Sequence, residues 1–123
     1  MSQPPSVAPA ATPLPDAEYH ARSHGVLDRL EALVDRWLDE DVIDVDSHRT
    51  GGLLEMSFPN GSKIVINTQP PLQELWLAAR GGGFHFRYCD GQWLDTKTSV
   101  EFHALLSEQA SLQAGKRLSF LSA

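Results

Sequence analysis

The stretch that decides the fold is NGSKIVINTQPPLQELWLA, residues 60–78. Asn60-Gly61 is a strong signal for a β-hairpin turn, and it leads into the β-branched run 63–67. Pro70-Pro71 then interrupts the chain, because proline has no backbone N–H to donate to a strand ladder. Residues 75–78 follow as another strand. The stretch therefore predicts consecutive strands joined by short turns, which is typical of an antiparallel sheet.

Strand-like segments continue on both sides of this stretch. Upstream, residues 42–46 and 53–58 have the pattern of strands, and Asp44 and Asp46 fall on one face of the first. Downstream, we predict strands at 84–88 and 92–95, each preceded by a glycine-containing turn. The glycines at 81–83 lack the Gly-Lys-Ser/Thr ending of a phosphate-binding loop and the helix that should follow it, so they indicate a turn.

Helical spacing brackets the strands. Between residues 16 and 40, apolar residues recur every three or four positions: Val26, Leu27, Leu30, Leu33, Val34, Trp37 and Leu38. Thr98 and Glu101 have the spacing of a capping box and predict the start of a last helix. Its expected apolar face is Val100, Phe102, Leu105, Leu106 and Leu112, and Gly115 is expected to end it. Leu118 and Phe120 are expected to pack back on the core.

The order helix, six short strands, helix predicts the α+β class. We expect a two-layer α/β sandwich, with two helices packed on one face of an antiparallel sheet of about six strands. The other face of the sheet must then meet solvent or a partner. Residues 1–15 hold five prolines, so we predict a flexible Pro/Ala-rich tail over residues 1–16 and one domain over residues 17–120.

The composition restricts the class of protein. The chain of 123 residues is 41% hydrophobic and has one cysteine, Cys89, which fits a single globular domain without an internal disulfide. No apolar run reaches the ~18 residues of a membrane helix. The first basic residue is Arg22, so the N-terminal segment has no basic targeting character. We expect a cytoplasmic protein that does not bind membranes.

Negative charge is concentrated in one quarter of the chain. Residues 16–46 contain ten of the sixteen Asp and Glu residues and three of the ten Lys and Arg residues. On the predicted helix, the acids at 28, 31, 35 and 39 lie within about 80° of each other, and His24 shares their side. This asymmetry favours a charged partner and argues against nucleic acid, whose phosphates carry the same charge.

We define the acidic ridge as the candidate metal ligands of this segment: Asp28, Glu31, Asp35, Asp39, Glu40, Asp41, Asp44 and Asp46, with His24 beside them. A solvated helix face is the ordinary explanation of such a run. Like charges four residues apart with few bases between them favour a function instead. Carboxylates are hard ligands for hydrated iron, calcium, magnesium or manganese, and a convex row of them predicts weak, unselective binding.

A second candidate surface is the sheet face away from the helices. Leu75 and Leu77 are expected to point toward the helices, which leaves Trp76 on the open face, where it is a candidate interface anchor. A core position is the ordinary expectation for tryptophan, and it is kept for Trp37 and Trp93.

Several of these segments resemble the bacterial branch of the frataxin family. The resemblance rests on residues 60–72, 75–78 and 82–88, on Trp93, on the acidic first helix and on residues 109–115, and it covers about residues 17–120. It implies weak binding of ferrous and ferric iron by the acidic ridge. It also implies docking on the cysteine desulfurase and scaffold protein of iron–sulfur cluster assembly, with the chain as iron donor or iron-dependent brake. The implied partner contacts are Asn67, Gln69 and Trp76, with His85 added from the next strand.

Some positions depart from the family pattern, and the function stays open among three hypotheses. His24 and Ala32 stand where an acid is common, and Arg87 stands where an aspartate is common. The first hypothesis is a regulatory iron-binding protein, the second a ferroxidase or iron-sequestering oligomer, and the third an acidic mimic that binds a basic protein without metal. No Glu-x-x-His motif of di-iron bundles is present, so we expect a protein that is not an enzyme, and a monomer unless iron assembles it.

Overall fold

The computed structural model describes residues 10–123 and confirms the predicted α+β order. Helix α1 (Asp16–Asp39) precedes the sheet and helix α2 (Phe102–Ala114) follows it. A 3₁₀ turn, η1 (Pro70–Leu72), joins the third strand to the fourth. The six strands lie in the order of the sequence, each antiparallel to its neighbour: β1 (Asp46–Thr50), β2 (Leu53–Ser57), β3 (Lys63–Gln69), β4 (Glu74–Ala79), β5 (Gly82–Cys89) and β6 (Gln92–Asp95).

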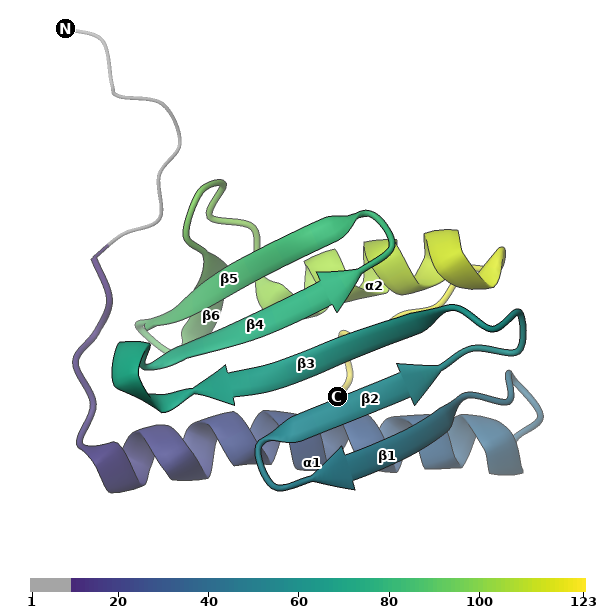
Figure 1. Cartoon of the computed structure of the whole chain (residues 1–123), viewed down its shortest axis with the longest axis horizontal. Helices are drawn as coiled ribbons and strands as arrows, with labels where there is room; N and C mark the ends of the chain where they lie inside the picture. The colour runs from purple at the N-terminus through teal and green to yellow at the C-terminus, as the bar shows by residue number, and fades with distance from the viewer. Residues whose placement is uncertain (1–9) are drawn as a thin grey trace, which may run out of the picture.

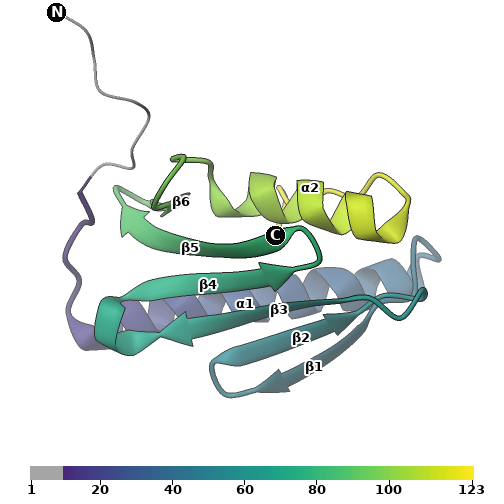
Figure 2. The same cartoon turned by 45° about the horizontal axis from the view of Figure 1, so that its top comes forward.

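The two helices lie on one face of the sheet, as predicted for a two-layer sandwich (Figures 1 and 2). Helix α1 packs against β1, β2 and β3, whereas α2 packs against β4 and β6. The opposite face of the sheet carries no helix of the described residues. Neither helix in residues 10–123 combines the length and apolar character that crossing a lipid bilayer requires.

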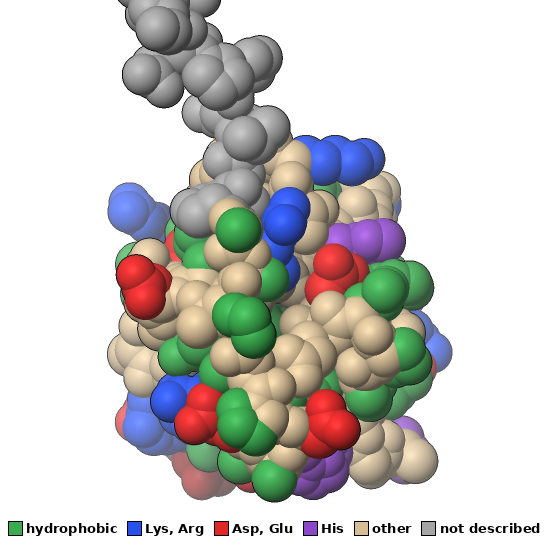
Figure 3. Space-filling model, turned by 90° about the vertical axis from the view of Figure 1, so that its left-hand side faces the viewer, with side chains coloured by type: hydrophobic (Ala, Val, Ile, Leu, Met, Phe, Trp, Pro, Cys, Tyr) green, Lys and Arg blue, Asp and Glu red, His purple; other side chains and the backbone are tan. Residues whose placement is uncertain are grey.

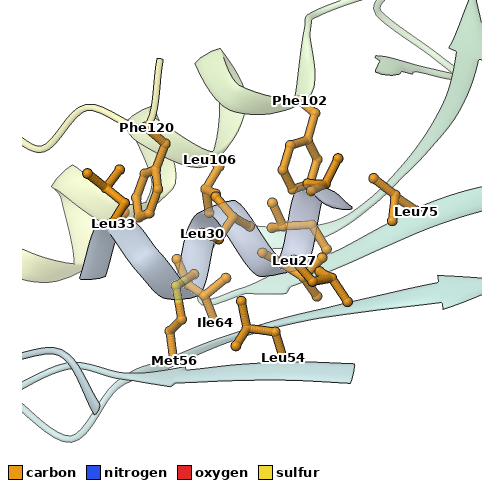
Figure 4. Packing of buried hydrophobic residues seen from close by; sticks show 14 of the residues in the cluster. Leu27, Leu30, Leu33, Leu54, Met56, Ile64, Leu75, Phe102, Leu106 and Phe120 are labelled. Carbon is orange, nitrogen blue, oxygen red and sulfur yellow. The ribbon is translucent and has the colours of Figure 1, made fainter. Parts of the chain in front are cut away.

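Alternation along the strands builds the core between the layers. Leu54 and Met56 of β2, Ile64 of β3 and Leu75 of β4 are fully buried, and they point toward Leu27 and Leu30 of α1 (Figure 4). Phe102 and Leu106 of α2 close the same core. Phe120 is fully buried beside them, and its ring centroid lies 4.9 Å from that of Trp37 with the planes 60° apart, which confirms that the C-terminal segment packs back.

The strand predicted at residues 42–46 is wrong, because β1 begins only at Asp46. Helix α1 ends in a left-handed turn at Asp41, whose φ is +60°, and the N–H of Val42 donates to the carbonyl of Trp37 at 2.8 Å. Asp46 pairs with Ser57, the last residue of β2, so residues 42–45 have no strand to pair with. The segment is a connection that carries acids, not a strand with an acidic face.

The predicted start of the last helix is also wrong. Glu101 itself caps α2, because its carboxylate accepts hydrogen bonds from the N–H groups of His103 and Ala104 at 2.9 and 3.1 Å. Thr98 belongs to the preceding turn, where its N–H donates to Asp95. Gly115 ends the helix as predicted, with φ of +65°.

Three apolar side chains expected in the core are exposed: Leu38, Val100 and Leu112. Leu112 follows Leu105 by seven residues, and an α-helix rotates about 20° over that interval. Leu105 is already at the edge of the buried face, so Leu112 turns outward and is 70% exposed.

The described part of the predicted tail already contacts the domain, while residues 1–9 lie outside the described residues. The N–H of Thr12 donates to the carbonyl of Tyr88 at 2.8 Å. Leu14 exchanges two hydrogen bonds with the side-chain amide of Gln73, one through its N–H and one through its carbonyl. The residues just before α1 are thereby held against β5 and against Gln73, which links η1 to β4.

Candidate functional site

The acidic ridge follows the outer side of α1 and continues through the connection to β1. Asp28, Asp35 and Asp39 are exposed on the helix, whereas Glu31 is half-buried. The left-handed turn at Asp41 ends the helix and leaves the remaining acids exposed after it: Glu40, Asp41, Asp44 and Asp46. All of these acids except Glu31 are therefore exposed at the surface.

A cation from β1 divides the ridge into two parts. Arg49 Nη1 lies 2.7 Å from Asp28 Oδ1 and 2.8 Å from Glu31 Oε1. The Arg49 side chain is only 17% exposed, and its Nε donates to the carbonyl of Gly51 at 2.6 Å. Burial alone would lower the pKa of Arg49, but the hydrogen bonds to Asp28 and Glu31 outweigh it and raise that pKa. These two carboxylates are therefore already occupied by a fixed positive charge.

His24 belongs to the same group. Its Nδ1 lies 3.2 Å from Arg49 Nη2, and its ring stacks on that of His20 with centroids 3.9 Å apart. A guanidinium can only donate, so Nδ1 is the acceptor and Nε2 carries the proton of the neutral ring. Burial, followed by the positive charges of His20 and Arg49, lowers the pKa of His24. A metal at His24 would have to displace this arrangement. We call His24, Asp28, Glu31 and Arg49 the Arg49 cluster.

The other acids of the ridge have no such partner. We call them the open half: Asp35, Asp39, Glu40, Asp41, Asp44 and Asp46. Within residues 10–123, none of their carboxylates makes an ion pair or a side-chain hydrogen bond. Lys116 reaches the connection after α1, where its ammonium donates to the backbone carbonyl of Val42 and not to a carboxylate of the open half. The open half is thus a row of exposed oxygen ligands with retained negative charge.

The geometry of the row limits how it can hold a metal. No group of three or more His, Cys, Asp or Glu side chains is placed to enclose a metal ion in the part of the chain that the structure describes. Exposed carboxylates that do not converge attract hydrated cations electrostatically and replace few of their waters. A donor set of this kind suits weakly held hydrated cations and does not suit a permanent metal centre.

The four predicted partner contacts lie on the open face of the sheet. Strand register places Asn67 opposite Trp76 and Trp76 opposite His85, so three of them form one row across β3, β4 and β5. Gln69 lies two residues from Asn67 on the same face, opposite Glu74. Leu75 and Leu77 are buried under the helices, which confirms the predicted orientation of β4.

Trp76 is held in place on this face by a ring stack and a hydrogen bond. Its ring stacks on that of His85 with centroids 4.1 Å apart and planes 5° apart. Its Nε1 donates to Glu74 Oε1 at 2.9 Å, and the same oxygen is 4.0 Å from His85 Nδ1. The indole is half-buried, and one of its faces is covered by the His85 ring of the neighbouring strand β5. A rigid aromatic platform of this kind loses little entropy when a partner covers it.

Tyr19 was not singled out from the sequence, yet it positions this surface. It is buried in α1, and its hydroxyl donates to the carbonyl of Glu74 at 2.6 Å and accepts from the N–H of Gln69 at 3.0 Å. Burial raises the pKa of Tyr19, so the phenol stays protonated and keeps both bonds. The β3–β4 connection, which carries Gln69 and Glu74, is therefore fixed to the helix layer.

The two candidate surfaces carry different chemistry. At the end of the molecule where α1 begins, acidic side chains stand singly among basic, histidine and apolar ones (Figure 3). The open half gathers its acids at the other end of α1 and after it. The open half lies on α1 and the connection after it, whereas the row of Asn67, Trp76 and His85 lies on the sheet, so the two surfaces are separate.

Comparison with known proteins gives consistent results. The frataxin-like domain model matches residues 12–116. Two bacterial relatives, each named iron-sulfur cluster assembly protein CyaY, come from Variovorax paradoxus and Paraburkholderia phymatum. They are 49% and 48% identical, and the matches cover 88% and 82% of this chain and 98% and 92% of theirs.

Solved structures agree in fold. The frataxin of Psychromonas ingrahamii superposes with a TM-score of 0.70 at 32% identity, over 87% of this chain and 98% of that one. A trimeric frataxin of Saccharomyces cerevisiae, complexed with ferrous iron, gives 0.61 at 25% identity, over 88% and 93%. The family model spans most of the chain, and its relatives match it nearly end to end. The chain therefore belongs to the frataxin-like family.

Proposed function

We propose that this chain is a cytoplasmic iron–sulfur cluster assembly protein that binds iron weakly and docks on the assembly machinery to regulate it. The name of its relatives supports the assembly role. The observation that carries the proposal is the open half of the ridge: six exposed carboxylates without partners among residues 10–123, in a chain of this family. The function is binding and regulation, not catalysis.

Iron binds through the open half in this proposal. Ferrous and ferric iron are served by carboxylate oxygens, and sites of this openness keep several waters on the metal. The affinity is then micromolar or weaker, and manganese or calcium competes. Asp28, Glu31 and His24 contribute little, because Arg49 already neutralises or orients them.

Docking uses both surfaces. The open half steers the chain onto a basic patch of the cysteine desulfurase. A cluster of negative charges attracts a positively charged partner over about a Debye length, and this attraction raises the association rate. The row of Asn67, Trp76 and His85, with Gln69 beside it, supplies short-range contact with the desulfurase–scaffold assembly. The sheet face is suited to this because its aromatic platform is already ordered.

The test combines a metal titration with a binding assay. Ferrous iron is titrated without oxygen and competed with manganese, and immobilised cysteine desulfurase then captures the protein with and without iron. We expect weak, competable iron binding and salt-sensitive capture. Capture with no measurable iron binding would support the acidic mimic instead, and absence of capture in both conditions would refute the docking proposal.

An iron-sequestering oligomer is the second candidate function. The specific observation in its favour is the likeness to the trimeric yeast frataxin complexed with ferrous iron. Sedimentation velocity on the protein with increasing ferrous iron, in air and without oxygen, decides between the two. A monomer at all iron loadings excludes the oligomer. Assembly that requires both iron and oxygen would favour it over the regulatory adaptor.

A further inference from the structure

A groove on the other side of α1 is not used by the proposed function. It has a volume of about 450 Å³ and lies between α1, the β5–β6 turn and the start of α2. Its walls include the aromatic residues Tyr88 and Trp93, and the basic residues Arg22 and Arg29 border it. The start of α2 contributes Glu101 and His103. A groove that combines aromatic walls with a few converging charged groups is a candidate small-molecule site.

The two arginines belong to a basic stripe along α1. Arg22, Arg29 and Arg36 are seven residues apart, which places them on one side of the helix. Arg29 makes no ion pair or side-chain hydrogen bond among residues 10–123. Arg22 lies 5.1 Å from the Tyr88 ring centroid and 3.5 Å from Glu18, an exposed pair that stabilises little. Both guanidinium groups can therefore turn toward a ligand.

The Glu101–His103 pair places an unsatisfied nitrogen beside these arginines. His103 Nδ1 lies 2.7 Å from Glu101 Oε2, so the carboxylate fixes the ring. Burial alone would raise the pKa of Glu101, but hydrogen bonds from His103 and the backbone outweigh it and lower that pKa. His103 Nε2 is buried and has no hydrogen-bond partner in the described residues. A buried polar atom without a partner is costly, so a water or ligand is expected to satisfy it.

We propose that this groove binds a small oxyanion carrying two or more negative charges, the class of phosphate monoesters and polycarboxylates. Glu101 is engaged by His103 and by the N–H groups at the start of α2. Among residues 10–123, the Arg22 guanidinium has only the exposed Glu18 as an ionic partner, so Arg22 and Arg29 can both be redirected to an anion. A dianion bridges Arg22 and Arg29. Because His103 Nδ1–H is engaged by Glu101, Nε2 donates to an oxygen of the dianion only from the protonated ring. The aromatic wall accommodates an organic part. This site is independent of the open half, which repels anions.

The experiment follows the His103 imidazole by NMR in metal-free protein. Inorganic phosphate and citrate are titrated separately at constant ionic strength, with chloride as the reference anion. We expect saturable movement of the His103 ring resonances with at least one of the two. Phosphate alone assigns a phosphate-type ligand, and citrate alone assigns a polycarboxylate.

Variants then separate the groove from general attraction. Arg22→Gln with Arg29→Gln should weaken binding at least about tenfold. Arg80→Gln removes the same charge from the exposed β4–β5 turn and should leave binding unchanged. The single Arg29→Gln variant replaces the double one if that variant is less than fully folded. No saturable shift with either anion, or equal loss in Arg80→Gln, would overturn the proposal.

Discussion

The two halves of the acidic ridge contain the same kind of side chain and differ in one cation. In the Arg49 cluster, the carboxylates of Asp28 and Glu31 share the guanidinium of Arg49 at 2.7 and 2.8 Å. In the open half, the acids keep their charge without a partner among residues 10–123. Whether a carboxylate of α1 is free to bind a cation therefore depends on whether a basic side chain from another helix or strand already pairs with it. One half of the ridge is engaged by Arg49, and the other half stays exposed.

Replacing Arg49 with Gln is expected to have the largest effect on this contrast. It removes hydrogen bonds to two charged groups, so the free energy of unfolding should fall by about 1.5–3 kcal/mol, measured by urea denaturation. It also releases Asp28 and Glu31, so iron affinity should rise. Lys63→Gln, which breaks the more exposed pair with Glu55, is the matched control and should cost about 0–1 kcal/mol. An equal loss in both variants would mean that the Arg49 cluster is not special.

Neutralising each half separately compares them directly. Asp35→Asn, Asp39→Asn and Asp41→Asn together should weaken iron binding at least about tenfold, or ~1.4 kcal/mol, because they remove half of the open carboxylates. Asp28→Asn with Glu31→Gln should change iron affinity much less and lower stability instead. Isothermal titration with ferrous iron under nitrogen measures the first quantity and urea denaturation the second. If both variants lost iron affinity equally, the Arg49 cluster and the open half would not differ in their ability to bind iron.

Trp76→Ala tests whether contact and charge are separable. Binding to the desulfurase–scaffold assembly should weaken about tenfold, mainly through faster dissociation, while iron affinity stays unchanged. Loss of the stack on His85 should lower stability by only about 0.5–1.5 kcal/mol. Surface plasmon resonance at two salt concentrations separates the association rate from the dissociation rate.

The contrasting variant is Trp93→Ala. Because Trp93 is buried, its loss should lower the free energy of unfolding by about 3–5 kcal/mol. Wild-type dissociation of Trp76→Ala would show that the sheet face is not an interface.

A smaller effect should appear in the pH dependence of stability. The pKa of His24 is lowered in the folded state from its ordinary value of 6.5, so the unfolded chain binds this proton first as pH falls. The stability that comes from neutral His24 is present above pH 6.5 and declines as pH falls toward the folded pKa. Thermal melts between pH 7.5 and 5 should show this decline reduced in His24→Asn. His48→Asn, at an exposed position of β1, is the control. An unchanged profile in His24→Asn would remove His24 from the Arg49 cluster.

Prediction from the sequence succeeded for features that depend on a few neighbouring residues, such as turns, strand faces and helix ends. The Asn60-Gly61 turn, the alternation around Trp76 and the glycine end of α2 each depend on a few neighbouring residues, and each is confirmed. It failed at residues 42–46, where an apolar–acidic alternation resembles a strand. Whether such a segment pairs depends on how far β2 extends, and that is decided by the turn after Ser57.

The sequence by itself indicated the family through its resemblance to known members. It also determined the order of elements, the excess of acid in residues 16–46 and the face on which Trp76 lies, because these follow from composition and local spacing. Only the tertiary structure decided which acids remain available. Arg49 lies 18 residues from Glu31 and 21 from Asp28, and strand pairing alone brings its guanidinium across to α1. Tyr19 reaches the β3–β4 connection, and His103 reaches the groove beside Arg29, for the same reason. Long-range electrostatic partners depend on three-dimensional packing, which no periodicity in a single chain encodes.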